Sequence, residues 1–91
     1  MVETAVTLKI LGRVHGVFFR ASMADIAATH GVRGWVRNLP DGSVLAFLEG
    51  EEDKVMRVVE WARQGPPRAR VDSIKVEKAP VRNSRNFRIE G

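Results

Sequence analysis

The segment from Gly12 to Arg20 holds the groups in this chain that are best suited to chemistry. It contains two glycines and two arginines, and it lies between an alternating apolar run and a run with helical spacing. Glycines let backbone N–H groups converge on a ligand, a helix N-terminus favours negative charge, and the Arg20 guanidinium can donate to two oxygens at once. The segment therefore predicts an oxyanion site, with phosphate as the first candidate.

Elimination narrows what this loop can do to a phosphate. Cysteine phosphatases carry a thiolate upstream of the loop arginine, and Val14 stands at that position. A P-loop needs Gly-Lys followed by Ser or Thr, which is absent here. His15 is a conceivable nucleophile, but the second histidine, His30, falls on the face of a predicted helix. We therefore expect the loop to bind phosphate without supplying a nucleophile, so that water attacks directly.

Direct attack by water suits a substrate with a good leaving group. An acyl phosphate expels a carboxylate, which needs no general acid, so positioning and charge stabilisation suffice. Asn38 is the candidate for orienting the water, because it ends a predicted strand just before the Leu39-Pro40-Asp41-Gly42 turn. Its amide donates and accepts hydrogen bonds without titrating. Arg20 and Asn38 are thus the predicted catalytic residues.

The apolar periodicities predict a regular series of elements around these residues. In order, they are a strand at Val6–Leu11, a helix at Ala21–His30 ending at Gly31, strands at Gly34–Asn38 and Ser43–Glu49, a helix from Glu51 to the Gly65-Pro66-Pro67 stop, a strand at Arg70–Lys78 with Ile74 and Val76 facing inward, a polar loop at Ala79–Asn86 and a short strand at Phe87–Ile89. This order predicts one domain over residues 1–91, an α+β ferredoxin-like β-α-β-β-α-β sandwich. Its antiparallel sheet would carry two helices on one face, with an additional C-terminal strand.

The chain resembles the acylphosphatase family at both parts of the candidate site. The first family signature is Gly-x-Val-Gln-Gly-Val-x-Phe-Arg, which Gly12–Arg20 matches except that His15 replaces glutamine. The second runs from a Gly-Trp pair through an asparagine to an Asp-Gly turn, as Gly34–Val44 does. Gln64-Gly65-Pro66-Pro67 and Phe87-Arg88-Ile89 also resemble the family. The likeness covers nearly the whole chain.

The resemblance implies hydrolysis of acyl phosphates to a carboxylate and inorganic phosphate, without a metal or cofactor. It implies that Arg20 binds the substrate phosphate and that Asn38 orients the attacking water. Backbone amides of the loop would cradle the phosphate oxygens; these belong to His15, Gly16, Val17, Phe18 and Phe19. The side chains of Phe18 and Phe19 are expected to pack rather than to touch substrate. An imidazole at position 15 would add a pH dependence.

Composition leaves several anionic partners open. The net charge of +4 attracts phosphorylated metabolites, nucleic acid and acidic membranes alike. The chain has no cysteine, which excludes disulfides and thiolate catalysis. The start of the chain does not resemble a signal peptide, and no run is long enough to span a bilayer. We expect a cytoplasmic monomer whose partners are a small acyl phosphate and inorganic phosphate, not nucleic acid or membrane.

The alternative function is a basic ferredoxin-like module that binds RNA or another anion without catalysis. RNA-binding sheets of this plan stack bases on aromatic residues of their first and third strands. Here Val6–Leu11 has no aromatic residue and Ser43–Glu49 has only Phe47. An anion sensor would need the cradle but would have no use for Asn38. The terminal carboxylate of Gly91 follows the last predicted strand, so we also expect it to lie near Arg20.

Overall fold

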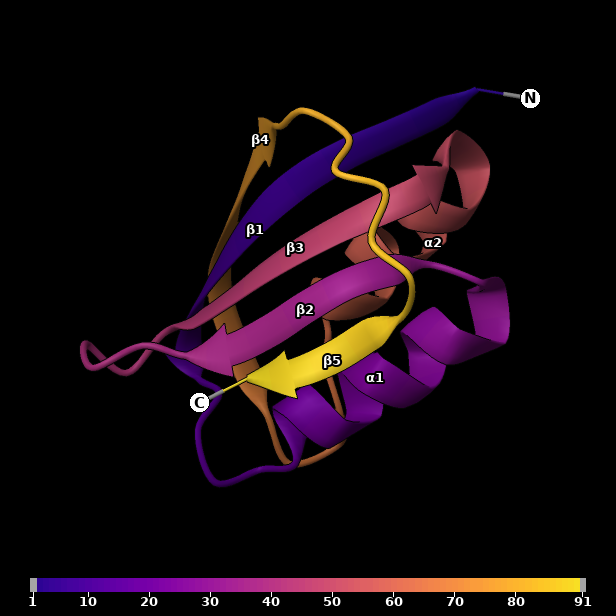
Figure 1. Cartoon of the computed structure of the whole chain (residues 1–91). Helices are drawn as coiled ribbons and strands as arrows, with labels where there is room; N and C mark the ends of the chain where they lie inside the picture. The colour runs from indigo at the N-terminus through magenta and orange to yellow at the C-terminus, as the bar shows by residue number, and fades with distance from the viewer. Residues whose placement is uncertain (1, 91) are drawn as a thin grey trace.

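The computed structural model describes residues 2–90 as a five-stranded sheet with two helices packed on one face (Figure 1). In chain order the elements are β1 (Glu3–Arg13), α1 (Phe19–His30), β2 (Arg33–Asn38), β3 (Val44–Glu51), α2 (Glu52–Ala62), β4 (Arg70–Lys78) and β5 (Phe87–Glu90). The strand order is β4-β1-β3-β2-β5. The first four strands of this order pair antiparallel, whereas β5 joins β2 in parallel. The ferredoxin-like prediction is confirmed, and the added strand makes the sheet mixed.

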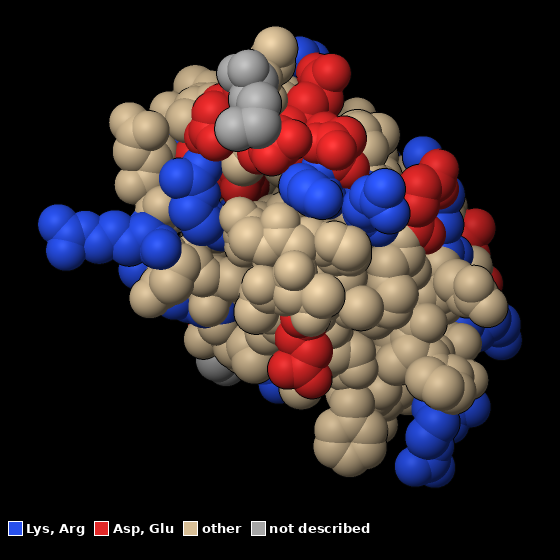
Figure 2. All heavy atoms as spheres, turned by 90° about the vertical axis from the view of Figure 1, so that its right-hand side faces the viewer, with Lys and Arg blue, Asp and Glu red and all other residues tan. Residues whose placement is uncertain are grey.

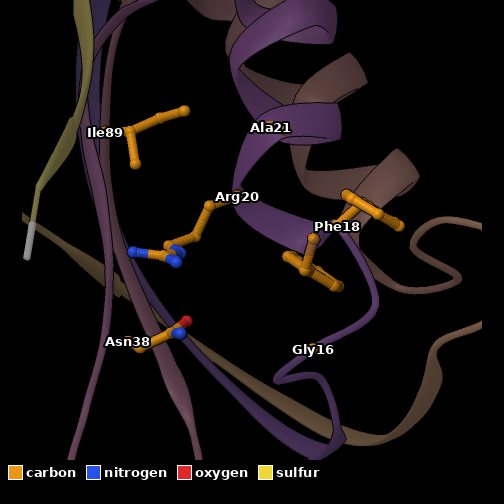
Figure 3. Close-up of a pocket in the computed structure, with 7 residues that line it drawn as sticks. Gly16, Phe18, Arg20, Ala21, Asn38 and Ile89 are labelled. Atoms are coloured by element: carbon orange, nitrogen blue, oxygen red, sulfur yellow. The ribbon is translucent and has the colours of Figure 1, made fainter.

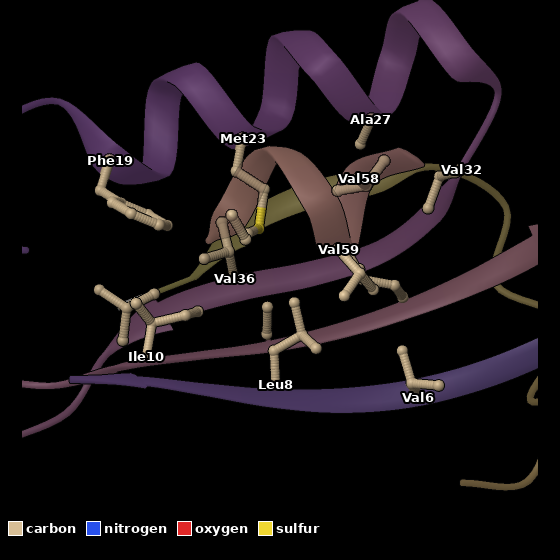
Figure 4. Close-up of a cluster of buried hydrophobic side chains, with 14 of the residues drawn as sticks. Val6, Leu8, Ile10, Phe19, Met23, Ala27, Val32, Val36, Val58 and Val59 are labelled. Carbon is tan, nitrogen blue, oxygen red and sulfur yellow. The ribbon is translucent and has the colours of Figure 1, made fainter. Parts of the chain in front are cut away.

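The core is a single apolar layer between the helices and the sheet (Figure 4). On β1, Leu8 and Ile10 are fully buried, as the alternating pattern predicts. The buried stripe of α2 consists of Val55, Val58, Val59 and Ala62. From α1 the layer receives Phe19, Met23 and Ala27. Both helices are therefore fixed to the sheet by their apolar stripes, and the first turn of α1 is held beside the loop that precedes it.

Val76 lies on the core face of β4 as predicted, since it pairs with the buried Leu8 of β1, but it is not buried there. Its side chain is 38% exposed, whereas Ile74 on the same strand is partly buried and packs against the core. The reason is topological, because β4 is an edge strand and α2 packs over the central strands β1 and β3. Alternation identifies the face of a strand but not how far the helices extend over it.

Gly12 is required where β1 ends and the loop begins. Its φ is +134°, and a Cβ there would lie 2.1 Å from the carbonyl oxygen of Arg70 on β4. The pairing of β1 with β4 shifts register between Leu11 and Gly12. The absence of a side chain thus lets β4 pass closely, and the bulge redirects the chain into the segment that leads to α1.

The segment from 79 to 86 crosses the face of the sheet that the helices leave open (Figure 1). It is anchored by the carboxylate of Glu49, a residue on β3 that is completely buried. Oε1 accepts hydrogen bonds from the backbone N–H groups of Arg82 at 2.9 Å and Asn83 at 3.0 Å, and Oε2 accepts one from Ser84 at 2.7 Å. This anchor guides the chain from β4 across the sheet to β5.

The environment of Glu49 perturbs its pKa in two opposing ways. Burial raises the pKa, while the hydrogen bonds from Ser84, Arg82 and Asn83 together lower it further, so the net pKa lies below its ordinary value of 4.5. Because the folded-state pKa is depressed, the carboxylate stabilises the fold fully above about pH 4.5. This stabilisation is lost as the pH falls through the folded-state pKa.

We expect Glu49→Leu to lower the free energy of unfolding by about 3 kcal/mol near neutral pH, because three backbone donors lose their charged acceptor. Urea unfolding measures this difference, and Glu77→Leu on the exposed part of β4 is the matched control with little expected effect. The difference between wild type and Glu49→Leu should shrink in acid. A loss below about 0.5 kcal/mol at neutral pH would contradict the role of the anchor.

Candidate active site

The loop between β1 and α1 is held to the core by two valine side chains. Val14 and Val17 are only 1% and 5% exposed, so they fix the loop from beneath. Gly16 between them is exposed and has a φ of +69°, a left-handed conformation that glycine adopts without strain. The loop therefore turns its backbone towards solvent at the N-terminus of α1, where N–H groups have no helical acceptor.

Arg20 lies in the first turn of α1 and is partly buried. Its Nη1 donates to the backbone carbonyl oxygen of Glu90 on β5, at 3.4 Å. The Glu90 carboxylate in turn pairs with Arg37 at 2.8 Å and Arg88 at 3.1 Å. The end of β5 thus directs the Arg20 guanidinium. The expected contact with the Gly91 carboxylate lies outside the described residues.

Asn38 is the last residue of β2, and its side chain lies in the same pocket as the guanidinium of Arg20 (Figure 3). Its Oδ1 atom is buried and has no hydrogen-bond partner among residues 2–90. A buried carbonyl oxygen without a donor is unfavourable, and a water molecule that donates to it would remove that cost. The described residues therefore leave the hydrogen-bonding capacity of the Asn38 acceptor unused.

A single pocket of about 390 Å³ contains these two side chains (Figure 3). It is lined by Gly16, Phe18, Phe19, Arg20, Ala21, Asn38 and Ile89. Most of the residues predicted for the site are therefore brought together. His15 and Val17, whose predicted contribution is a backbone N–H, do not line the pocket: the side chain of His15 turns towards the β2–β3 turn and that of Val17 enters the core.

The turn after Asn38 is fixed by its own hydrogen bonds. The N–H of Gly42 donates to the Leu39 carbonyl at 3.1 Å, which closes the predicted turn. The Asp41 carboxylate accepts from the backbone N–H and hydroxyl of Ser43, and Lys9 on β1 pairs with it at 3.1 Å. The Ser43 hydrogen bonds and Lys9 lower the pKa of Asp41 to about 2, so it remains an acceptor throughout the neutral range.

Comparison with known proteins agrees with this arrangement. The family model described as acylphosphatase matches residues 6–89. The chain belongs to the acylphosphatase family. The acylphosphatase of Pyrobaculum arsenaticum is 59% identical over 70 residues, which cover 76% of this chain and 74% of that protein. The acylphosphatase of Thermococcus kodakarensis is 48% identical over 84 residues, covering 92% of each chain.

A solved acylphosphatase structure also has the same fold. The enzyme from Coxiella burnetii superposes with a TM-score of 0.93 at 38% identity, covering 97% of this chain and 93% of that one. The mixed five-stranded sheet with two helices is thus the acylphosphatase fold. The resemblance found in the two sequence signatures is confirmed over almost the whole chain.

His15, which replaces the glutamine of the acylphosphatase signature, connects the loop between β1 and α1 to the turn between β2 and β3. Its Nε2 lies 2.8 Å from the backbone carbonyl oxygen of Ser43. Because a carbonyl only accepts, Nε2 must carry the hydrogen. The same oxygen accepts the N–H of Leu39 at 2.9 Å. The loop and the turn that follows Asn38 therefore meet at one atom, a contact between residues far apart in the sequence.

One site expectation in this acylphosphatase is wrong in part. Phe19 packs as predicted, since it is 2% exposed and its ring centroid lies 5.3 Å from that of Trp61. Phe18 instead points outward, is 71% exposed and lines the pocket. The cause is its backbone, because a φ of 64° at the residue before α1 turns its side chain away from the core. Sequence spacing does not reveal this conformation.

The acidic run Glu51-Glu52-Asp53 has a structural explanation. The helix α2 begins at Glu52, so Glu52 and Asp53 complement its N-terminus. Figure 2 shows acidic side chains gathered on the side of the molecule where α2 begins. Within residues 2–90 no group of three His, Cys, Asp or Glu side chains is arranged to hold a metal ion. In the same part of the chain, no helix is long and apolar enough to cross a membrane.

The open face of the sheet is unsuited to the RNA-binding alternative. Phe47, the aromatic residue on β3, is 2% exposed, and the guanidinium of Arg82 lies 5.9 Å from the centre of its ring. The segment from 79 to 86 crosses this face (Figure 1). Base stacking needs an accessible ring, so this arrangement favours the enzyme over a module that presents its sheet to RNA.

Proposed function

We propose that this acylphosphatase hydrolyses small-molecule acyl phosphates by direct attack of water on phosphorus, with no phosphorylated enzyme intermediate. The observation that carries the proposal is the pairing of Arg20 with the unpartnered Oδ1 of Asn38 in one pocket. A cation and a water acceptor in one pocket are the two parts that such a reaction needs.

The phosphate group is bound by Arg20 and by backbone N–H groups of the loop. The guanidinium donates to two phosphate oxygens, and the amides of residues 15–19 donate to the others. Because phosphoryl transfer involves negatively charged oxygens throughout, fixed donors around them lower the barrier without rearranging during the reaction. The N-terminus of α1 adds a favourable field at the same place.

The attacking water is held by Asn38. Oδ1 accepts one hydrogen of the water, which aims a lone pair of the water at phosphorus. The new bond joins the water oxygen to phosphorus, and the bond between phosphorus and the acyl oxygen breaks with its electron pair leaving on the carboxylate. The proton of the water passes to solvent. No general acid is required, because a carboxylate is a stable leaving group.

We propose that His15 positions the loop relative to Asn38 through Ser43. His15→Ala is therefore expected to raise both the KM for acetyl phosphate and the inhibition constant of inorganic phosphate by about tenfold, because the loop loses one hydrogen bond that orients it. His15→Gln, whose amide can also donate to the Ser43 carbonyl, should restore most of the affinity. If the glutamine variant binds acetyl phosphate and inorganic phosphate as weakly as the alanine variant, the hydrogen bond to Ser43 is not the contribution of His15.

The activity is tested by incubating the purified protein with acetyl phosphate and EDTA and measuring phosphate release. We expect release far above the spontaneous rate, and EDTA should not affect it because no proposed step uses a metal. Absence of acceleration over buffer would contradict the proposed function.

We also propose that the chain acts as a single-domain monomer, because each proposed group comes from one chain. The mass of the protein in solution, measured by light scattering, tests whether it is a monomer. We further propose that it acts in the cytoplasm.

A further inference from the structure

We propose that the part of the pocket beyond the phosphate site binds the acyl group of the substrate and favours apolar acyl groups, above all aromatic ones. This inference rests on the proposed function, because Arg20 must hold the phosphate. It concerns Phe18 and Ile89, whose side chains line the pocket on either side of Arg20 (Figure 3). The geometry thus points to a substrate class.

The pocket is larger than a phosphate group requires. Its volume is about 390 Å³, and the lining side chains other than Arg20 and Asn38 carry no polar atoms. These are contributed by Phe18, Phe19, Ala21 and Ile89, with Gly16 adding only backbone. A covalent bond joins the acyl group to the phosphate, so the acyl group must occupy the space next to Arg20. Apolar walls there favour an apolar occupant.

Phe18 has a backbone conformation that is unfavourable for an aromatic residue. Its φ of 64° and ψ of 27° lie in the left-handed region, where a bulky side chain is strained and glycine or asparagine is favoured. Burial of the ring does not offset this strain, because Phe18 is 71% exposed. Strain at a residue beside a binding pocket is a feature of functional sites. The ring is therefore placed to contact a ligand.

Ile89 provides a second apolar wall from a different element. It lies on β5 opposite Val36 of β2, and 50% of its surface is exposed. Phe87, two residues earlier on the same face, packs against the core. Ile89 extends past that packing to the pocket near the first turn of α1. Two exposed apolar side chains from separate elements thus border the space that the acyl group must enter.

The test compares phenylacetyl phosphate with acetyl phosphate, which have the same reacting group and differ by one phenyl ring. Wild type should have the higher kcat/KM for phenylacetyl phosphate. Phe18→Asn retains a residue that favours the left-handed conformation, and Ile89→Thr retains a β-branched side chain. Each variant should reduce the ratio of the two kcat/KM values about fivefold, as expected for loss of one apolar contact with an aromatic ring.

Val76→Thr is the matched control, because Val76 is 38% exposed on β4 and does not line the pocket. It should leave the ratio unchanged. Inhibition by inorganic phosphate, which has no acyl group, should keep its wild-type constant in Ile89→Thr. An unchanged ratio in Ile89→Thr overturns the proposal even if Phe18→Asn disturbs the loop. Failure of wild type to hydrolyse acetyl phosphate contradicts the proposed function instead.

Discussion

Arg20→Ala is expected to reduce kcat/KM for acetyl phosphate about a thousandfold, the largest effect of any single substitution in this acylphosphatase. The guanidinium is the cation in the pocket, and removing a cation that stabilises a phosphoryl transition state has effects of this order. Binding of the product suffers too, so the inhibition constant of inorganic phosphate should rise steeply. Steady-state kinetics with phosphate as inhibitor measures both quantities.

Two variants separate charge from geometry at this position. Arg20→Lys keeps the charge but loses the two-pronged donor, so it should recover only part of the activity. Arg13→Ala removes an exposed arginine from the same loop segment and should have little effect. Because Arg20 also donates to the Glu90 carbonyl, the thermal unfolding of each variant must be measured. Near-normal activity in a folded Arg20→Ala would contradict the assignment.

Asn38→Ala is expected to lower kcat about a hundredfold while changing the inhibition constant of phosphate less than about twofold. In the proposed mechanism Asn38 holds the water and not the phosphate, so its loss would misplace the nucleophile without weakening the binding of phosphate. Asn86→Ala, which alters an exposed asparagine outside the pocket, is the control. Equal losses in kcat and in phosphate affinity would show that Asn38 binds phosphate instead.

The fold was predictable from the sequence because local patterns determine most of it. Alternation at Val6, Leu8 and Ile10 identifies a buried central strand, and Gly31 ends α1 in the left-handed conformation expected of a helix cap. The placement of Arg20 and Asn38 in one pocket was predictable for a related reason. Arg20 follows a glycine-containing loop, and Asn38 ends a strand before a strong turn signal. Both positions are defined by residues close to them in the chain.

What the sequence could not reveal depends on contacts between distant segments. His15 is hydrogen-bonded to Ser43, and the Glu49 carboxylate is hydrogen-bonded to residues 82–84. Each of these contacts joins positions that come close together only when the sheet forms. The contact of Ser43 with Asp41 was partly predictable, because in an Asp-Gly-Ser turn the aspartate side chain accepts a hydrogen bond from the backbone N–H two residues later. The pocket-facing ring of Phe18 had no such signal, since a left-handed aromatic residue contradicts local preference.

Direct attack of water on phosphorus is tested by the stereochemistry at phosphorus. Acetyl thiophosphate, whose phosphorus carries sulfur, oxygen-16 and oxygen-18 in one configuration, is hydrolysed by the enzyme in water labelled with oxygen-17, and the configuration of the product thiophosphate is determined. We expect inversion, with the oxygen of the water found in thiophosphate, because a single displacement occurs. Retention would require two displacements through a phosphorylated residue such as His15, and label in the carboxylate would require attack at carbon. Either result would contradict direct attack of water on phosphorus.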